Sequence, residues 1–192
     1  SSVWGSPTSD YLRALHVDNG GSLHLCGHTT SDAFPVTSSF VDNTMKGGHY
    51  DAWYAQIDQN LKSVQRASYV GGKNNDYCND VSSANDGSIY LAIDTNSNEL
   101  LGRSATYPGR RLQGGLIAKI EPSISPGSKE DTIDLIAAFR SGSYTSIKDL
   151  TVGDQTMWVT GYSEAEPTDQ FISIGAHTVG QPRLIFAQIG PN

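Results

Sequence analysis

The sequence is poor in positive charge and in long apolar runs. Lys and Arg number 13 against 20 Asp and Glu, so the net charge is −7, and Arg110-Arg111 is the only adjacent basic pair. Because a nucleic-acid surface needs clustered basic side chains to neutralise phosphates, we expect no nucleic-acid partner. No apolar stretch approaches the roughly 18 residues of a membrane-crossing helix, so we expect no membrane span.

The sequence also lacks the short motifs by which many enzymes are recognised. It contains no Gly-x-Ser-x-Gly elbow, no His-Glu-x-x-His pair, no phosphate-binding Gly-x-x-x-x-Gly-Lys loop and no Cys-x-x-Cys pair. No helical period of useful length is present; the nearest segment, 128–138, reads equally well as a loop followed by a strand. We therefore expect an all-β chain with no catalytic residues, no metal centre and no cofactor.

A repeated pattern fills the chain. Its opening, a Gly five residues before an Asp-Tyr pair, occurs at Asp10-Tyr11 and again at Asp76-Tyr77. A later marker, an Ala within an apolar strand pattern, recurs at Ala55, Ala118 and Ala187. Such a period indicates a repeat architecture, in which each unit buries its apolar face against its neighbours.

Each repeat holds four short strand patterns, and a turn of the Asp-Gly or Asn-Gly type joins the first two. Four antiparallel strands per repeat is the plan of a β-propeller blade. We therefore predict one all-β, β-propeller-type domain over residues 1–192, with about three four-stranded antiparallel blades. The repeats are expected at about 11–76, 77–145 and 146–192, and residues 1–10 are expected to complete the last one.

The strand patterns at the two ends of the chain predict an assembly. The sequence begins with a fourth-strand pattern and ends with a third-strand pattern, so the N-terminal strand is expected to complete the last blade in the same chain or a neighbouring one. Two chains would then form a six-bladed ring. A paired piece of a longer propeller, an unusual three-bladed unit and a misread period stay open. The residues expected in this contact are Ser2, Val3, Trp4, Leu184, Phe186 and Gln188.

Three segments share a pattern with a known family: Tyr69-Val-Gly-Gly with the following Asp76-Tyr77, residues 26–35 and residues 51–58. They resemble the SBBP-type β-propeller repeat, and the resemblance covers nearly the whole chain, although it decays after the first repeat. The resemblance implies a propeller fold in a secreted or cell-surface bacterial protein and carries no catalytic signature. We expect Ser1 to be a processed end, which fits removal of a secretion signal.

Cys26 and Cys78 are the only cysteines. Cys26 lies in a predicted second strand and Cys78 near the start of the next repeat, so adjacent blades could bring them within bridging range. A disulfide that closes this loop would stabilise the fold by roughly 4 kcal/mol in the chain-entropy model. The alternative is two buried thiols that act as small apolar residues.

Oxygen-bearing side chains gather in the loop that opens the second repeat. Asn74, Asn75 and Asp76 lie there, and Asp10 holds the matching position in the first repeat. These four are the candidate ligand-binding residues, and calcium is one candidate ligand. No EF-hand spacing is present, however, and Asp and Asn also favour turns by bonding their own backbone.

His24 and His28 lie four residues apart in a predicted strand, so both side chains point to one face. Such a pair can begin a metal site. His24 nevertheless occupies the position held by Tyr90 and Trp158 in the other repeats, which indicates aromatic packing. We expect most aromatic residues of the strands, including Trp158, to lie in the core.

The predicted function is a non-enzymatic extracellular module, structural, adhesive or binding, secreted or at the cell surface. Its partner is expected to be a second copy or another propeller fragment, joined by strand or blade completion. The alternative is a secreted carbohydrate-active enzyme or lectin with its site at the mouth of the propeller channel, where carbohydrate would be the ligand. Fold alone does not decide between them.

Overall fold

The chain folds as antiparallel β-structure. The computed structural model describes residues 3–37, 44–100, 114–121, 132–141, 144–153, 156–164, 167–170 and 183–189. In these ranges the chain forms twelve strands and no helix, and every strand pairing is antiparallel. The all-β prediction is confirmed. The described part of the chain accordingly offers no helix that is long and apolar enough to cross a membrane.

The first sheet keeps the order of the chain. It consists of β1 (Asp10–Val17), β2 (Leu23–Thr29), β3 (Asp51–Ile57) and β4 (Val64–Tyr69). The turn between β1 and β2 closes with a hydrogen bond from the Gly21 N–H to the Asp18 carbonyl at 3.0 Å. Gly21 has a φ of 83°, which glycine adopts without a Cβ clash, so the predicted turn chemistry produces this hairpin.

The second sheet follows the same plan and gains a strand from further along the chain. Its strands are β5 (Asp76–Ser83), β6 (Ile89–Thr95), β7 (Gly114–Glu121) and β8 (Thr132–Ser141), with β11 (Pro167–Gln170) paired to the outer edge of β8. The third sheet contains β9 (Thr145–Val152), β10 (Met157–Ser163) and β12 (Arg183–Ile189), in the order β12-β10-β9.

The same irregularity recurs in the first hairpin of every sheet. A β-bulge interrupts the pairing after Leu12 in β1, after Cys78 in β5 and after Ile147 in β9. The shared bulge aligns the three sheets residue by residue. The aligned sets are Leu12, Cys78 and Ile147; Leu15, Val81 and Leu150; Val17, Ser83 and Val152; and His24, Tyr90 and Trp158.

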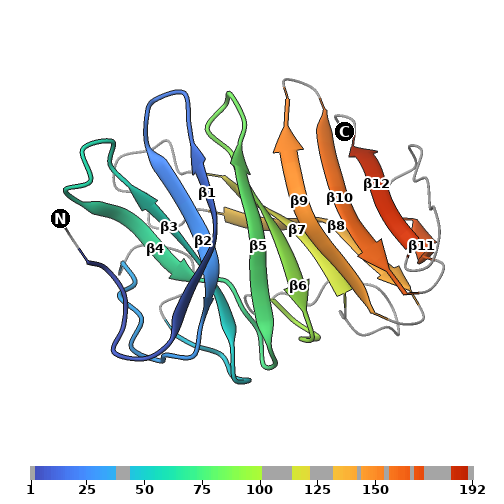
Figure 1. The fold of residues 1–192 in the computed structure, drawn as a ribbon, viewed down its shortest axis with the longest axis horizontal. Coiled ribbons are helices and arrows are strands. Elements are labelled where there is room, and N and C mark those ends of the chain that lie inside the picture. The colour runs from blue at the N-terminus through green and yellow to red at the C-terminus, as the bar shows by residue number, and fades with distance from the viewer. Residues whose placement is uncertain are drawn as a thin grey trace.

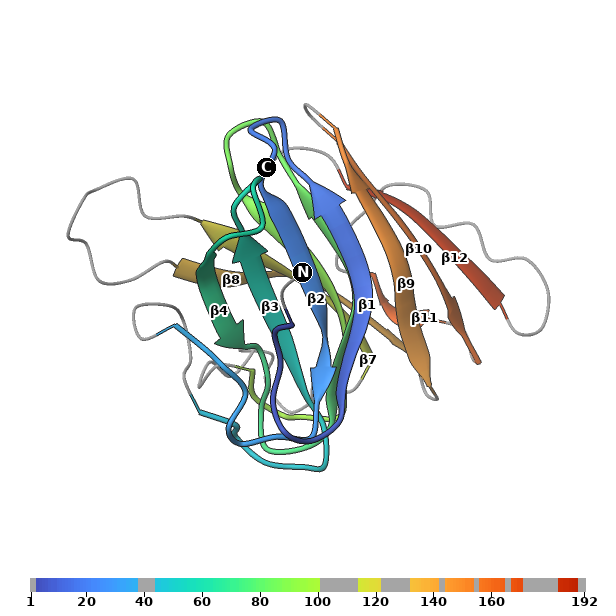
Figure 2. The same ribbon diagram turned by 60° about the vertical axis from the view of Figure 1, so that its left-hand side comes forward.

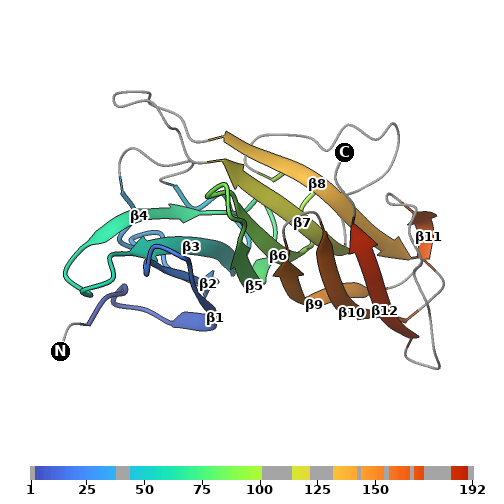
Figure 3. The same cartoon turned by 90° about the horizontal axis from the view of Figure 1, so that it is seen from above.

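The three sheets follow one another in a row, in chain order (Figure 1). β5 contacts β1 and β2, and β9 contacts β5 and β6, so the first strands of the sheets are neighbours (Figure 3). We call the face of each sheet toward the start of the row its upstream face and the opposite one its downstream face. The sets that contain Leu12, Leu15 and Val17 lie on upstream faces, and the set that contains His24 lies on downstream faces.

Two apolar cores fill the spaces between the sheets. The first joins the downstream face of the first sheet to the upstream face of the second; its largest members include Tyr54, Leu91, Ile93 and Leu116. The second joins the second sheet to the third and contains Ala92, Ile117, Ile147, Leu150 and Val159. Alternate residues of β6 enter opposite cores, because successive side chains of a strand point to opposite faces.

A disulfide crosses the first of these cores. It joins Cys26 of β2 to Cys78 of β5, and the two Cα atoms are 5.8 Å apart, within the usual range for a disulfide. Both residues are fully buried. The bridge therefore ties the first sheet to the second, and the alternative of two free thiols does not apply.

The described strands form no closed ring. The first sheet and β12 lie at opposite ends of the row, as Figures 1 and 2 show. The prediction that Trp158 lies in the core is wrong, because its side chain is 54% exposed. It lies on the downstream face of the last sheet in the row, where none of the described strands covers it.

Candidate functional site

Asp76 holds the loop that opens the second sheet. Its Oδ2 accepts hydrogen bonds from the Gly72 N–H at 2.6 Å and from the Ser97 hydroxyl at 2.9 Å, and its Oδ1 accepts one from the Thr95 hydroxyl. The side chain is fully buried, and this burial raises the pKa of the carboxyl to about 6. Both carboxyl oxygens are thus engaged in closing the loop.

Asp10 closes the equivalent loop of the first sheet. Its carboxyl accepts hydrogen bonds from the Ser6 N–H, from the Ser6 hydroxyl at 2.9 Å and from the Thr29 hydroxyl at 2.6 Å. In the third sheet Thr145 holds this position, and its hydroxyl lies 3.3 Å from the Ser163 hydroxyl. The repeated acid is therefore part of the framework in two sheets and is replaced by a neutral pair in the third.

Asn74 and Asn75 lie in the same loop as Asp76 and are used in a similar way. Asn75 Oδ1 accepts hydrogen bonds from the backbone N–H groups of His49 at 2.7 Å and Tyr50 at 3.2 Å. The Asn74 Nδ2 donates to a carbonyl of the next loop at 3.2 Å. The structure thus brings three of the four predicted ligand-binding residues together, while Asp10 belongs to the first sheet.

An aromatic cluster surrounds His28 at this same end of the sheets. Tyr11 stacks on the imidazole with ring centroids 4.7 Å apart, and Tyr50 and Tyr77 meet it edge-on at 5.2 and 5.0 Å. The Nδ1 atom of His28 has no hydrogen-bond partner. Burial, and secondarily the charge of Arg13, lowers the pKa of His28 to about 4. The imidazole is therefore neutral at physiological pH.

The sequence signal for this cluster is the Tyr that follows the repeated Asp. A Tyr follows the repeated Asp in both Asp10-Tyr11 and Asp76-Tyr77. Because neighbouring strand residues point to opposite faces, each Asp turns into its loop and each Tyr turns toward His28. The Tyr11 side chain is 44% exposed, so the cluster presents part of one aromatic ring to solvent.

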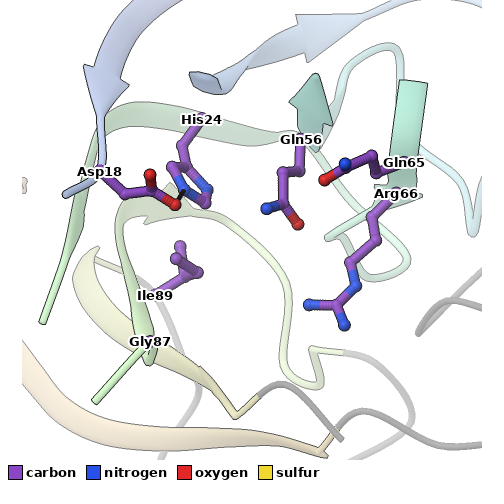
Figure 4. A pocket seen from close by; sticks show the side chains of 7 residues that line it. All are labelled: Asp18, His24, Gln56, Gln65, Arg66, Gly87 and Ile89. Atoms are coloured by element: carbon purple, nitrogen blue, oxygen red, sulfur yellow. Dashed lines mark hydrogen bonds and ion pairs between the residues drawn. The ribbon is translucent and has the colours of Figure 1, made fainter. Parts of the chain in front are cut away.

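A polar pocket of about 410 Å³ lies at the opposite end of the boundary between the first two sheets (Figure 4). Residues of the first hairpin and of β3 and β4 form one side, and residues of the turn before β6 and the start of β6 form the other. Amide, guanidinium, imidazole and carboxyl groups line it together with the apolar side chain of Ile89. Its lining residues are Asp18, His24, Gln56, Gln65, Arg66, Gly87 and Ile89.

His24 is held on both ring nitrogens within this pocket. Its Nε2 lies 3.0 Å from Asp18 Oδ2 and its Nδ1 lies 2.8 Å from the Tyr54 hydroxyl oxygen. Neither nitrogen is left to ligate a metal or to take a proton from a substrate. The Tyr54 ring stacks on the imidazole, which agrees with the packing interpretation of this position.

Asp80 and Asp149 form a carboxyl pair at the boundary between the second and third sheets. Burial raises the pKa of Asp80 to about 6, and hydrogen bonding with the neighbouring Asp149 carboxyl contributes in the same direction. Asp80 Oδ2 also accepts the Leu150 N–H at 2.7 Å. The two catalytic carboxyls of glycosidases stand about 5 Å or more apart. Asp80 and Asp149 are hydrogen-bonded to each other, so they are too close for glycoside hydrolysis.

The oxygen-rich turns of the second repeat bond to their own backbone. Asp86 Oδ1 accepts the Ser88 N–H at 2.8 Å, and the turn closes through the Gly87 N–H and the Ala84 carbonyl at 3.0 Å. In the ranges that the structure describes, no three His, Cys, Asp or Glu side chains are placed to hold a metal ion together. The turn interpretation therefore explains these residues, and calcium binding stays an untested alternative.

The N-terminal segment, predicted to complete the last blade, lies beside the first sheet. Trp4 packs against Phe34 and Trp53, with ring centroids 4.8 and 5.7 Å apart. The Val3 side chain is fully exposed, and neither residue is in a strand. Ser2 lies outside the described residues. Within this chain the segment thus contacts the upstream face of the first sheet.

The other half of the predicted contact lies in β12. This strand contains Leu184, Phe186 and Gln188, which pair with Tyr162, Thr160 and Trp158 of β10. Among the described strands β12 pairs with β10 alone and is the outer strand of its sheet. Completion of this edge by the N-terminal strand of a neighbouring chain stays a prediction.

Comparisons with known proteins add no family to this picture. No protein-family model matches the chain, and no curated protein matches its sequence. The resemblance to SBBP-type repeats therefore rests on the sequence motifs alone.

Proposed function

We propose that the protein is a non-enzymatic extracellular module that serves as a structural, adhesive or binding unit. The observation that carries this proposal is the use of three acidic groups in the framework. Asp10 and Asp76 close loops, and Asp94 of β6 accepts hydrogen bonds from the Ser146 hydroxyl at 2.6 Å and the Ile147 N–H at 3.0 Å, both in β9. Groups suited to acid–base chemistry thus hold the framework together.

The stacking of the sheets supports a propeller-type arrangement within this proposal. Propeller blades are four-stranded antiparallel sheets that pack face to face around an axis, with their first strands nearest to it. Here β1, β5 and β9 are neighbours, and the sheets share one bulge at one position. We take the chain to be an open arc of three blades, the last of which lacks a fourth strand in the described residues.

The disulfide supports a location outside the reducing cytosol. Disulfides persist in secreted and surface proteins and are rare where glutathione and thioredoxin keep thiols reduced. The Cys26–Cys78 bridge is fully buried between two sheets, as a structural disulfide is. A secreted or cell-surface location, which the sequence resemblance also implies, is therefore part of the proposal.

A substrate screen tests the absence of catalysis. The purified, oxidised protein is incubated with polysaccharide and ester substrates, and products are measured beside an Asp18→Asn, His24→Ala variant of the polar pocket. We expect no turnover by either protein. Turnover by the unmodified chain that disappears in the folded variant would overturn the proposal and assign a catalytic role to the pocket.

A carbohydrate-binding function is the second candidate, because one feature favours it. The pocket has a volume of about 410 Å³, within the range of small-molecule sites, and its amide and guanidinium groups suit sugar hydroxyls. Binding of labelled glycans that Gln56→Ala abolishes, with no product formed, would establish a lectin. Loss of binding in Tyr11→Ala instead would place the ligand on the aromatic cluster at the opposite end.

A further inference from the structure

Upstream positions that are buried in the second and third sheets are exposed in the first. Leu15 is 55% exposed, whereas its equivalents Val81 and Leu150 are each 3% exposed. Leu12 and Val17, on the same face, are 56% and 52% exposed. Since the three sheets share one register, the difference arises from the missing neighbour: the preceding sheet covers these positions in the second and third sheets. We call Leu12, Leu15 and Val17 the upstream patch.

The downstream faces show the same contrast at the other end of the row. His24 is 2% exposed and its equivalent Tyr90 packs into the second core, but Trp158 is 54% exposed. Trp158 thus presents to solvent a large apolar side chain at a position where the equivalent side chains of the other two sheets pack against the next sheet. The downstream face of the third sheet is therefore left open in the same sense as the upstream patch.

The two internal boundaries show how an upstream and a downstream face meet. Tyr90 packs against the core that holds Leu150 and Val152, and on the first boundary the His16 Nε2 lies 2.8 Å from the Ser83 hydroxyl. Ser83 and Val152 are the equivalents of Val17. His16 is the cross-strand neighbour of His24, so the Tyr90 position and its neighbour on the first strand face the Leu15 and Val17 positions of the next sheet. Trp158 is the chain's remaining residue of this set.

A hydrogen bond repeats the same relation. Asp80, which follows the bulge in β5, accepts the Leu150 N–H at 2.7 Å across the second boundary. Leu150 is the equivalent of Leu15, so the Leu15 position contacts the preceding sheet through its backbone as well as through its side chain.

We propose that two copies of this chain associate head to tail, with Trp158 of one copy packed on the upstream patch of the other. The inference rests on the proposed assembling module and names its partner, a second copy. A downstream face packs on an upstream face at both internal boundaries of this chain. The chain has one uncovered face of each kind, at opposite ends of the row, so a second copy can cover both. Such a heterologous contact closes into a ring when the rotation permits, and two contacts then join six sheets.

Charged substitutions in each half test the contact. Leu15→Arg and Trp158→Arg each place a charge on one open face, and Leu61→Arg is the matched control, because Leu61 is equally exposed at 57% and lies in the turn after β3. Sedimentation velocity should show a dimer for the wild type and for Leu61→Arg. Each of the other two variants should weaken association by at least about 30-fold, as loss of an interface hot spot does, while circular dichroism confirms the fold.

A mixing experiment separates the head-to-tail contact from a symmetric one. Leu15→Arg keeps an intact Trp158 face and Trp158→Arg keeps an intact upstream patch, so an equal mixture should form a heterodimer through one native contact. A mixture that stays monomeric while each folded variant is monomeric would overturn the head-to-tail geometry, because a patch that meets its own copy is not restored by mixing.

A wild-type protein that stays monomeric over its soluble range would also overturn the inference, as would a dimer that neither substitution weakens. These outcomes are distinct from failure of the proposed function. Catalytic turnover contradicts the non-enzymatic module whether or not the chain dimerises. A monomer without turnover overturns the self-association alone.

Discussion

At the residue scale, one aspartate position determines how the first two sheets begin. Asp10 and Asp76 each accept a backbone N–H from the preceding loop and the hydroxyl of a Thr that ends the second strand. A carboxylate suits this role because it is acceptor-only and can take several donors at once. The position thus has a structural role, because the loop N–H and the Thr hydroxyl use the Asp carboxyl as their hydrogen-bond acceptor.

Replacement of Asp76 by alanine should lower the free energy of unfolding by about 3 kcal/mol, because hydrogen bonds to a charged group are lost and the buried Gly72 N–H keeps no acceptor. The measurement is urea unfolding followed by circular dichroism. Asp32→Ala is the control: Asp32 is exposed, and the change there should stay within about 0.5 kcal/mol. Equal midpoints for the two variants would contradict the role assigned to Asp76.

Replacement of Asp80 by asparagine should change the pH dependence of stability. The folded-state pKa of about 6 lies above the ordinary 3.8, so the stabilising contribution of the protonated form is complete below about pH 4 and is lost as pH rises through 6. The amide keeps an acceptor for the Leu150 N–H and removes the charge. The variant should therefore be more stable than the wild type at pH 7, by about 1 kcal/mol after solvent screening of this partly exposed group.

The difference between variant and wild type should vanish near pH 4. Thermal melts of both proteins across this pH range measure the difference. Because His28 and Asp76 titrate in both proteins, their contributions to stability cancel when the two are compared. A variant that is less stable at pH 7 would show that the Asp80 carboxylate is favoured in the folded state.

The sequence was sufficient to single out Asp10 and Asp76 but not to place the groups around them. Their repetition marked them as candidate ligand-binding residues in matching loops, and the structure shows that their carboxyls close those loops. The cluster around His28 could not be assembled from the pattern, because Tyr50 comes from a loop far from Tyr11 and Tyr77 in sequence. Trp158 was assigned to a core on the strength of its strand position, which is correct only where another sheet follows.

At the scale of elements, the strands of the first two repeats follow from alternation and turn chemistry. The predicted turn at Asp18–Gly21 forms as expected, and the four strands of each repeat pair in order. β11 was not foreseen, since four residues that begin with Pro167 give no alternating pattern to detect. The bulges were not foreseen either, because an extra residue in a strand shows only in the register of its partner.

Removal of the disulfide should uncouple the first two sheets. The Cys26→Ala, Cys78→Ala variant loses a link across 52 residues, which corresponds to about 4 kcal/mol in the chain-entropy model. Thermal or urea unfolding measures the loss, and reduction of the wild type should lower its stability to a similar degree. A variant as stable as the oxidised wild type would mean that the apolar core alone fixes the two sheets.

At the scale of the whole molecule, the chain is a row of three similar sheets with an open face at each end. Repeat proteins cover such faces with capping units, because an uncapped apolar surface promotes association. Here Trp4, Phe34 and Met45 cover part of the upstream face of the first sheet. The upstream patch and Trp158 are nevertheless more than half exposed. The sequence predicted three units and a need for completion, but the open faces are evident only from exposure at equivalent positions.

Native mass spectrometry of the intact, oxidised chain tests this arrangement most directly. Two head-to-tail contacts between two copies close a ring of six sheets, so the expected result is the mass of two chains, without a ladder of larger species. Dilution should convert this dimer to single chains. The mass of one chain at every concentration would contradict the assembly of open faces.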